Sequence, residues 1–154
     1  MASETTTQQG WAGTRFGQPK VGATASISRT FGPRDVELFS EISGDRNPLH
    51  IDEKAAKASV FGGLITQGGI TTGLLNAVVA EQLPGPGTVF LSVSWSFRRP
   101  TYFGETMTAT VTVEKARDDK PICNLRTVVV NAEGEVCVEG EAVTYTAVLG
   151  EGGV

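Results

Sequence analysis

A nearly uncharged stretch in the middle of the chain constrains the fold more than any other feature of the sequence. Residues 69–83 carry a single charged side chain, Glu81, and apolar residues lie on almost every side of the helix that this stretch predicts. A helix that is apolar nearly all round has to be buried. The stretch ends in Pro-Gly-Pro-Gly at residues 84–87, which terminates a helix. The chain therefore needs a second layer that is large enough to cover one long helix.

After this helix the hydrophobic period changes to that of strands. Apolar side chains alternate with threonine and serine in residues 88–97 and with threonine in residues 105–114, which predicts half-buried strands. Two further strands, residues 121–130 and 135–148, are separated by Asn-Ala-Glu-Gly, a sequence that favours a hairpin turn. Upstream, the pattern predicts a strand at residues 21–31 and short helices at residues 32–44 and 51–60.

The order of these elements predicts an α+β fold. The simplest way to bury the long helix is to wrap the antiparallel sheet around it, which is the hotdog architecture. The length of 154 residues fits one domain. We expect this domain to span residues 20–148, after a flexible tail at residues 1–19 in which Trp11 is a candidate anchor. Residues 149–154 are expected to form a loose end.

The composition excludes several classes of protein. A net charge of −4 argues against a general nucleic-acid binder, and the apolar runs are far shorter than the roughly 20 residues that span a membrane. The beginning of the chain lacks the pattern of a secretory signal. Cys123 and Cys137 fall on the two strands of one hairpin, with an offset of roughly 16 Å that is too long for a disulfide. We therefore expect free thiols and a cytoplasmic protein.

The octapeptide Ser-Gly-Asp-Arg-Asn-Pro-Leu-His contains the only histidine of the chain, His50, five positions after Asp45. Pro48 stiffens the turn between them and restricts Asn47 to extended conformations. A carboxylate and an imidazole at a fixed separation can hold one water and exchange protons with it. The alternative is that Asp45 caps a turn and that His50 is a polar residue whose hydrogen bonds are satisfied locally.

In its wider context the octapeptide resembles the signature of the (R)-specific enoyl-CoA hydratases, also called MaoC-like dehydratases. An aromatic residue precedes it at Phe39, and a small residue follows the histidine at Ala56. The resemblance extends over residues 20–147. It implies a hotdog fold and the reversible addition of water to trans-2-enoyl-CoA, giving (R)-3-hydroxyacyl-CoA, with Asp45 and His50 as the catalytic pair.

The resemblance also implies a backbone donor at the start of the long helix. In the family a glycine N–H faces the thioester oxygen, and the matching residue here is Gly68, whose N–H has no partner inside the helix. Its neighbours Gln67 and Gly69 are candidate substrate contacts, and Gln67 replaces a histidine that is frequent in the family. Asn76 stands where some members carry serine. We expect it to be buried on nearly the same face as Gly68, where it either points into the acyl tunnel or bonds a backbone carbonyl.

The remaining candidate contacts concern the rest of the substrate. Arg98, with Arg99, and Lys120 could meet the phosphates of CoA, although arginines at strand ends are usually solvated. Asn47 is a further candidate and is also expected to bond the local backbone. The sequence contains no metal-binding cluster and no phosphate-cradling glycine motif, so neither a metal nor a cofactor is expected.

Two other functions stay open. A hotdog thioesterase usually carries a carboxylate on the long helix, where this chain has only Glu81 near the end. A non-catalytic acyl-thioester binding module would have no need to keep both Asp45 and His50. The substrate is expected to be an acyl-CoA or an acyl carrier protein thioester. We expect a homodimer or a dimer of dimers, paired through residues 88–97, with its sites between the subunits.

Overall fold

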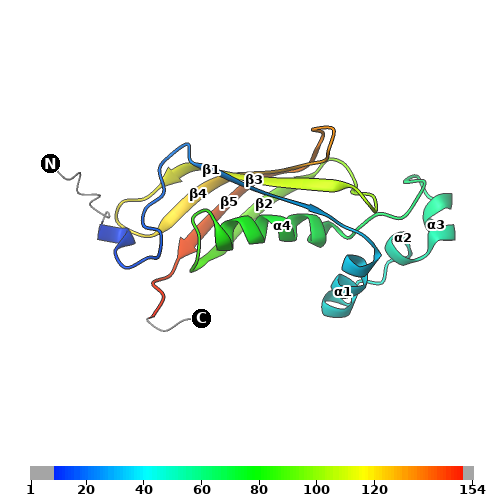
Figure 1. Cartoon of the computed structure of the whole chain (residues 1–154), viewed down its shortest axis with the longest axis horizontal. Helices are drawn as coiled ribbons and strands as arrows, with labels where there is room; N and C mark the ends of the chain where they lie inside the picture. The colour runs from blue at the N-terminus through cyan, green and yellow to red at the C-terminus, as the bar shows by residue number, and fades with distance from the viewer. Residues whose placement is uncertain (1–8, 151–154) are drawn as a thin grey trace.

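The computed structural model describes residues 9–150, in which a five-stranded sheet lies along one long helix (Figure 1). Residues 1–8 and 151–154, which include parts of both expected tails, lie outside the described residues. No helix within residues 9–150 is long and apolar enough to cross a membrane. The elements, after a short 3-10 turn at Gln9–Trp11, are β1 (Thr24–Thr30), α1 (Pro33–Ser43), α2 (Pro48–Ile51), α3 (Glu53–Ala58), α4 (Gly68–Glu81), β2 (Thr88–Phe97), β3 (Thr106–Ala116), β4 (Ile122–Val130) and β5 (Val136–Thr146).

The sheet is antiparallel throughout, with the strand order β1-β3-β4-β5-β2. α4 lies across one face of this sheet (Figure 1), and its side chains join those of β3, β4 and β5 in a single core. Burying a leucine or valine side chain contributes about 1.5–3 kcal/mol, so α4 and the sheet stabilise each other. The apolar residues that α4 buries are Ile70, Leu74, Leu75, Val78 and Val79. The arrangement confirms the α+β hotdog prediction.

β2 is an edge strand and departs from the predicted alternation. Its pairing register shifts between Phe90 and Ser92, which is a β-bulge that inserts one extra residue. Phe90 consequently packs against the core, edge-on to Trp95 with the ring centroids 5.7 Å apart. Four other large apolar side chains of β2 are 45–60% exposed, namely Val89, Leu91, Val93 and Phe97. One chain alone therefore leaves an apolar edge uncovered.

The N-terminal segment packs on the rest of the structure from residue 9, within the stretch that was expected to be a tail. Trp11 is fully buried, and its Nε1 donates a hydrogen bond to the carbonyl of Arg117 in the loop between β3 and β4. The N–H of Gly10 donates to the same loop at 3.0 Å. A Cβ at Gly10 would collide with the backbone of Asp119 and Lys120, so only glycine fits there. Trp11 is thus the anchor of this end of the molecule.

β4 and β5 form the predicted hairpin, closed by a hydrogen bond of 3.0 Å from the N–H of Gly134 to the carbonyl of Asn131. Cys123 pairs with Thr144 across this hairpin. Cys123 and Cys137 are both buried free thiols, as predicted. Burial raises the pKa of the Cys123 thiol to about 12 and also raises the pKa of Cys137.

Candidate active site

The last turn of α1 positions Asp45. The helix ends where Gly44 adopts a left-handed conformation, with φ at 81°, and its N–H donates to the carbonyl of Ser40 at 2.9 Å. Glycine reaches this conformation without a steric penalty. The hydroxyl of Ser43 then accepts from the N–H of Asp45 at 3.0 Å and donates to the carbonyl of Phe39 at 2.6 Å. Asp45 is therefore held directly outside the helix end.

The turn that follows is shaped by two consecutive side-chain acceptors. Oδ1 of Asp45 accepts from the N–H of Asn47 at 3.0 Å, and Oδ1 of Asn47 accepts from the N–H of Leu49 at 3.1 Å. Asn47 is thus the N-cap of α2, with Pro48 in the first helical position. The expectation that Asn47 bonds the local backbone is confirmed, and its oxygen is used by α2. Asp52 caps α3 in the same way.

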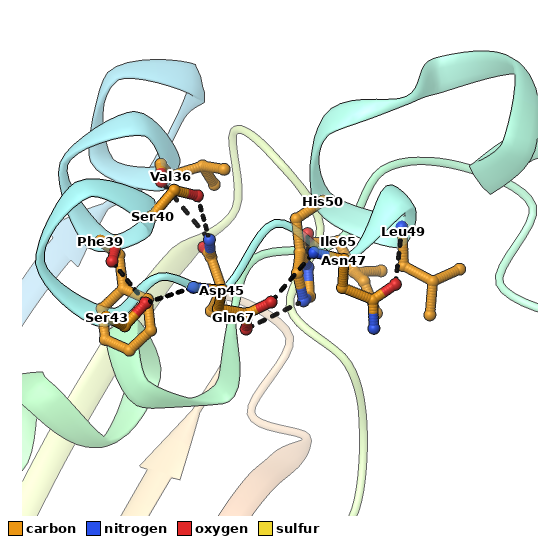
Figure 2. Close-up of polar contacts among 10 residues, drawn as sticks. All are labelled: Val36, Phe39, Ser40, Ser43, Asp45, Asn47, Leu49, His50, Ile65 and Gln67. Carbon is orange, nitrogen blue, oxygen red and sulfur yellow. Dashed lines mark hydrogen bonds and ion pairs between the residues drawn. The ribbon is translucent and has the colours of Figure 1, made fainter.

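His50 lies in α2 and is 8% exposed. Its Nδ1 is 2.7 Å from the carbonyl oxygen of Ile65, and because a carbonyl only accepts, Nδ1 carries a proton. In the neutral ring Nε2 therefore keeps a lone pair, which faces Oδ2 of Asp45 across 3.7 Å (Figure 2). A direct N–H···O hydrogen bond spans roughly 2.7–3.2 Å. The longer separation suits one water that contacts both atoms.

A cavity of about 420 Å³ brings His50 to the start of α4, since Gly68 and Phe97 also line it. Gly68 is the first residue of α4, where a backbone N–H lacks a helical partner and lies at the positive end of the helix. A Cβ at this position would be 2.8 Å from the ring of Phe97. The absence of a side chain therefore lets the ring, or a ligand in its place, approach the backbone closely.

Asn76 does not share this cavity, which corrects the expectation that it lies on the face of Gly68. Eight residues carry a helix about 80° beyond two full turns. Asn76 instead lines a separate groove of about 450 Å³ with Gly69, Gly73 and Phe39, between α4 and α1. It is exposed rather than buried, and its Nδ2 lies 3.5 Å from the carbonyl of Thr72.

Gln67 is also placed differently from the expectation of a substrate contact. It is 1% exposed and directs its amide nitrogen at α1, where Nε2 is 3.0 Å from Oγ of Ser40 and 3.4 Å from the carbonyl oxygen of Val36. Figure 2 shows the amide beside these residues, away from the imidazole of His50. The side chain thus contacts protein groups of the neighbouring helix.

The candidate phosphate-binding residues are divided between the two ends of the sheet. Arg98 and Arg99 line the His50 cavity, and each is paired with a glutamate, at 3.4 Å and 3.6 Å. Lys120 lies in the loop between β3 and β4, beside the 3-10 turn at the opposite end of the sheet from α2 (Figure 1). Within one chain, Lys120 is therefore not part of this site.

The roles of several groups that complete the site could not be read from the sequence. The Ile65 carbonyl fixes the His50 tautomer, and a backbone oxygen leaves no trace in the residue type. The ring of Phe97 covers Gly68, although the strand pattern only placed it on an apolar face. Ser43 was visible in the octapeptide, but its role requires the helix end to be known. Within residues 9–150, no three His, Cys, Asp or Glu side chains cluster so that they could hold a metal ion.

Residues 14–135 match the family model described as the MaoC like domain. The (R)-specific enoyl-CoA hydratase of Rhodospirillum rubrum is 37% identical over 135 residues, which cover 88% of this chain and 93% of that protein. Among solved structures, the (R)-hydratase of Aeromonas caviae involved in PHA biosynthesis aligns with a TM-score of 0.80 at 37% identity, covering 84% of this chain and 98% of that chain. An R-hydratase of Pseudomonas aeruginosa in the unliganded form aligns with a TM-score of 0.78 at 34% identity, over 83% and 82% of the two chains. The chain therefore belongs to the MaoC-like domain family.

Proposed function

We propose that the protein adds water reversibly to trans-2-enoyl-CoA and so forms (R)-3-hydroxyacyl-CoA. The observation that carries this proposal is the separation of 3.7 Å between Asp45 and His50, next to the first turn of α4. The reaction needs a base, an acid and a donor for the thioester oxygen, all of which these groups can supply. The relatives from Rhodospirillum rubrum and Aeromonas caviae are both named (R)-specific enoyl-CoA hydratase, which supports the same reaction class.

In the proposed mechanism one water lies between Oδ2 of Asp45 and Nε2 of His50. The water oxygen bonds to C3 of the substrate, and one water proton passes to the Asp45–His50 pair. The electrons of the C2–C3 double bond shift towards the thioester, whose oxygen receives a hydrogen bond from the N–H of Gly68. The pair then returns one proton to C2, so that one water is consumed and the pair regains its initial state.

The two cavities beside α4 suggest how the substrate lies. Arg98 and Arg99 border the His50 cavity, so we assign this side to the pantetheine and phosphate groups of CoA. The acyl chain extends past Asp45 into the groove at Gly69, Gly73 and Asn76, where a Cβ at position 73 would meet nothing within 4 Å. An acyl carrier protein thioester would present the same reacting atoms.

We further propose that two chains pair through the exposed apolar edge of β2, either as a dimer or within a dimer of dimers. A two-fold axis at this edge would place the beginning of one β2 beside the end of the other. Lys120 of one chain would then lie on the side of its partner's site. Light scattering is expected to give the mass of a dimer or tetramer, and a monomer mass at micromolar concentration would contradict this pairing. The proposed location of the protein is the cytoplasm.

Crotonyl-CoA tests the proposed function and separates it from the alternatives. Hydration removes the conjugated double bond, so that ultraviolet absorbance falls and chiral analysis finds the (R)-product. A thioesterase would instead release free thiol, although the only acidic residue of α4, Glu81, is its last residue and lies far from Gly68. Tight binding without either reaction would support a non-catalytic module.

A further inference from the structure

Gln67 is a buried link between two helices of the site. It precedes the first residue of α4 and is 1% exposed, while its Nε2 donates to Ser40 in α1 at 3.0 Å (Figure 2). The carbonyl of Val36 lies near the same nitrogen, at 3.4 Å. Because a carbonyl only accepts, this neighbour requires the nitrogen of the amide, rather than its oxygen, to face α1. The contact is directional and buried, so it fixes how α1 lies against the start of α4.

The contacts of Gln67 close a ring of interactions around the site. From Ser40 the last turn of α1 leads to Asp45, whose carboxylate faces His50 across 3.7 Å. His50 in turn bonds the carbonyl of Ile65 at 2.7 Å. Ile65 lies two residues before Gln67, which completes the ring. Both members of the acid–base pair are thereby held to the short segment that leads into α4.

We propose that Gln67 is a positioning residue, which sets the carboxylate of Asp45 against His50 and against the first N–H of α4. This inference rests on the proposed function. The hydrogen bonds that Asp45 makes to Ser43 and Asn47 lie within its own loop. They define the shape of that loop but not its distance from α4, which depends on where α1 lies. Gln67 is the polar side chain that ties α1 to the segment before Gly68.

Kinetics of Gln67→Met on crotonyl-CoA provide the first test, because methionine keeps the side-chain length and removes the donor. We expect kcat to fall about 10- to 100-fold with KM within about threefold, since a displaced catalytic group slows the reaction more than it weakens binding. Ser40→Ala should act in the same direction. Gln82→Met, the same substitution at an exposed position after the other end of α4, should leave kcat unchanged.

The Asp45→Asn background distinguishes positioning from a general structural role. If Gln67 acts through Asp45, Gln67→Met should lower the residual rate of Asp45→Asn much less than it lowers the rate of the unmodified enzyme. An equal factor in both backgrounds would overturn the proposal. So would an unchanged kcat, or a change confined to KM and chain-length preference, which would make Gln67 a substrate contact. If Gln67→Met does not fold, Ser40→Ala carries the same comparison.

A second readout does not depend on activity. His50 is the only histidine of the chain, so its imidazole 15N resonances can be followed without ambiguity. Gln67→Met and Ser40→Ala should move the Nε2 resonance in the same direction as Asp45→Asn does, and Gln82→Met should not. An unmodified protein that does not hydrate crotonyl-CoA would contradict the proposed function alone. If the unmodified protein is active but Gln67→Met does not shift the Nε2 resonance of His50, that result would contradict the positioning role alone.

Discussion

The two ends of the sheet are covered by different segments and differ in how tightly they are closed (Figure 1). At one end Trp11 is fully buried, and the backbone of the 3-10 turn is hydrogen-bonded to the loop between β3 and β4. At the other end residues of α2, the start of α4 and the end of β2 line a cavity, and Asp45, which faces His50, keeps 39% of its side chain exposed. The first end is closed by the packing around Trp11, and the second keeps polar groups around an open space.

This difference indicates that stability and chemistry are assigned to different parts of one small domain. Closing an end by packing excludes water, whereas the proposed reaction requires water to enter. Substitutions at the two ends should therefore have separable effects, on the free energy of unfolding at the Trp11 end and on turnover at the His50 end.

Of all the changes considered, Asp45→Asn and His50→Ala should have the largest effects. Both variants should lower turnover and leave stability nearly unchanged. Positioned acid–base groups contribute on the order of 10²–10⁴-fold in rate, so each variant should hydrate crotonyl-CoA at least about 10²-fold more slowly. The double variant should lose little more, because both groups act on one water. Steady-state kinetics and thermal melting, measured on the same samples, check the separation.

The control for this pair is Asp52→Asn, two residues after His50. Asp52 caps α3 by accepting from the N–H of Ala55 at 3.1 Å, and asparagine can make the same cap. Turnover and melting temperature should both stay close to those of the unmodified protein. A His50→Ala variant that stays active while the fold weakens would show that the imidazole is structural.

Trp11→Ala should have the opposite profile. Removing a fully buried aromatic side chain typically lowers the free energy of unfolding by about 3–5 kcal/mol, and Trp11 lies at the end of the molecule far from His50. Urea denaturation measures the loss, and kcat of the folded fraction should be unchanged. Trp11→Phe keeps an aromatic ring and loses the bond to Arg117, so about 1 kcal/mol is expected. A large loss of kcat in folded Trp11→Ala would contradict the division between the ends.

Gly10→Ala and Gly68→Ala introduce the same change, glycine to alanine, at one end of the sheet each. The new Cβ at position 10 would meet backbone that cannot move aside, which should lower stability by about 1–3 kcal/mol and leave kcat unchanged. At position 68 it would meet the ring of Phe97, which can rotate, and it would crowd the thioester oxygen. We therefore expect little loss of stability there and about a tenfold or greater loss of kcat. Equal stability losses in the two variants would count against this assignment.

Asn76→Ala should have the smallest effect, on preference rather than on rate. Its side chain lines the groove beyond Phe39, so the ratio of kcat/KM for long and short enoyl-CoA substrates should change by a few fold, with crotonyl-CoA hydration retained. A series of enoyl-CoA chain lengths measures this ratio. Asn124→Ala, at an exposed position of β4, is the matched control. A uniform loss at every chain length would assign Asn76 a structural role.

The sequence predicted those features that depend on a local period or a local turn. The apolar stretch of α4 and the alternation in β3, β4 and β5 identified the layers, because each pattern is set by the residues of one element. The Asp45–His50 approach was predictable for the same reason, since Pro48 and the caps that surround it lie within one turn.

Features that depend on packing between distant elements were not predictable. The bulge in β2 changes which side chains face the core, and its position is visible only in the pairing with β5. Gln67 was expected to contact substrate, but its partner Ser40 lies 27 residues away in another helix. Lys120 was assigned to a site from which the length of the sheet separates it in one chain.

Because the thiols of Cys123 and Cys137 are buried, the folded protein should react only slowly with thiol reagents. Thiolate is the form that reacts with disulfide reagents and alkylating agents, and a pKa raised to about 12 at Cys123 leaves almost none of it at neutral pH. Cys137 is only 1% exposed, and burial raises its pKa as well. A colorimetric thiol reagent added to the native protein should therefore report only coenzyme A released from a substrate. Maleimide labelling should begin only when the β4–β5 hairpin opens, which gives a reporter of unfolding that needs no engineered probe.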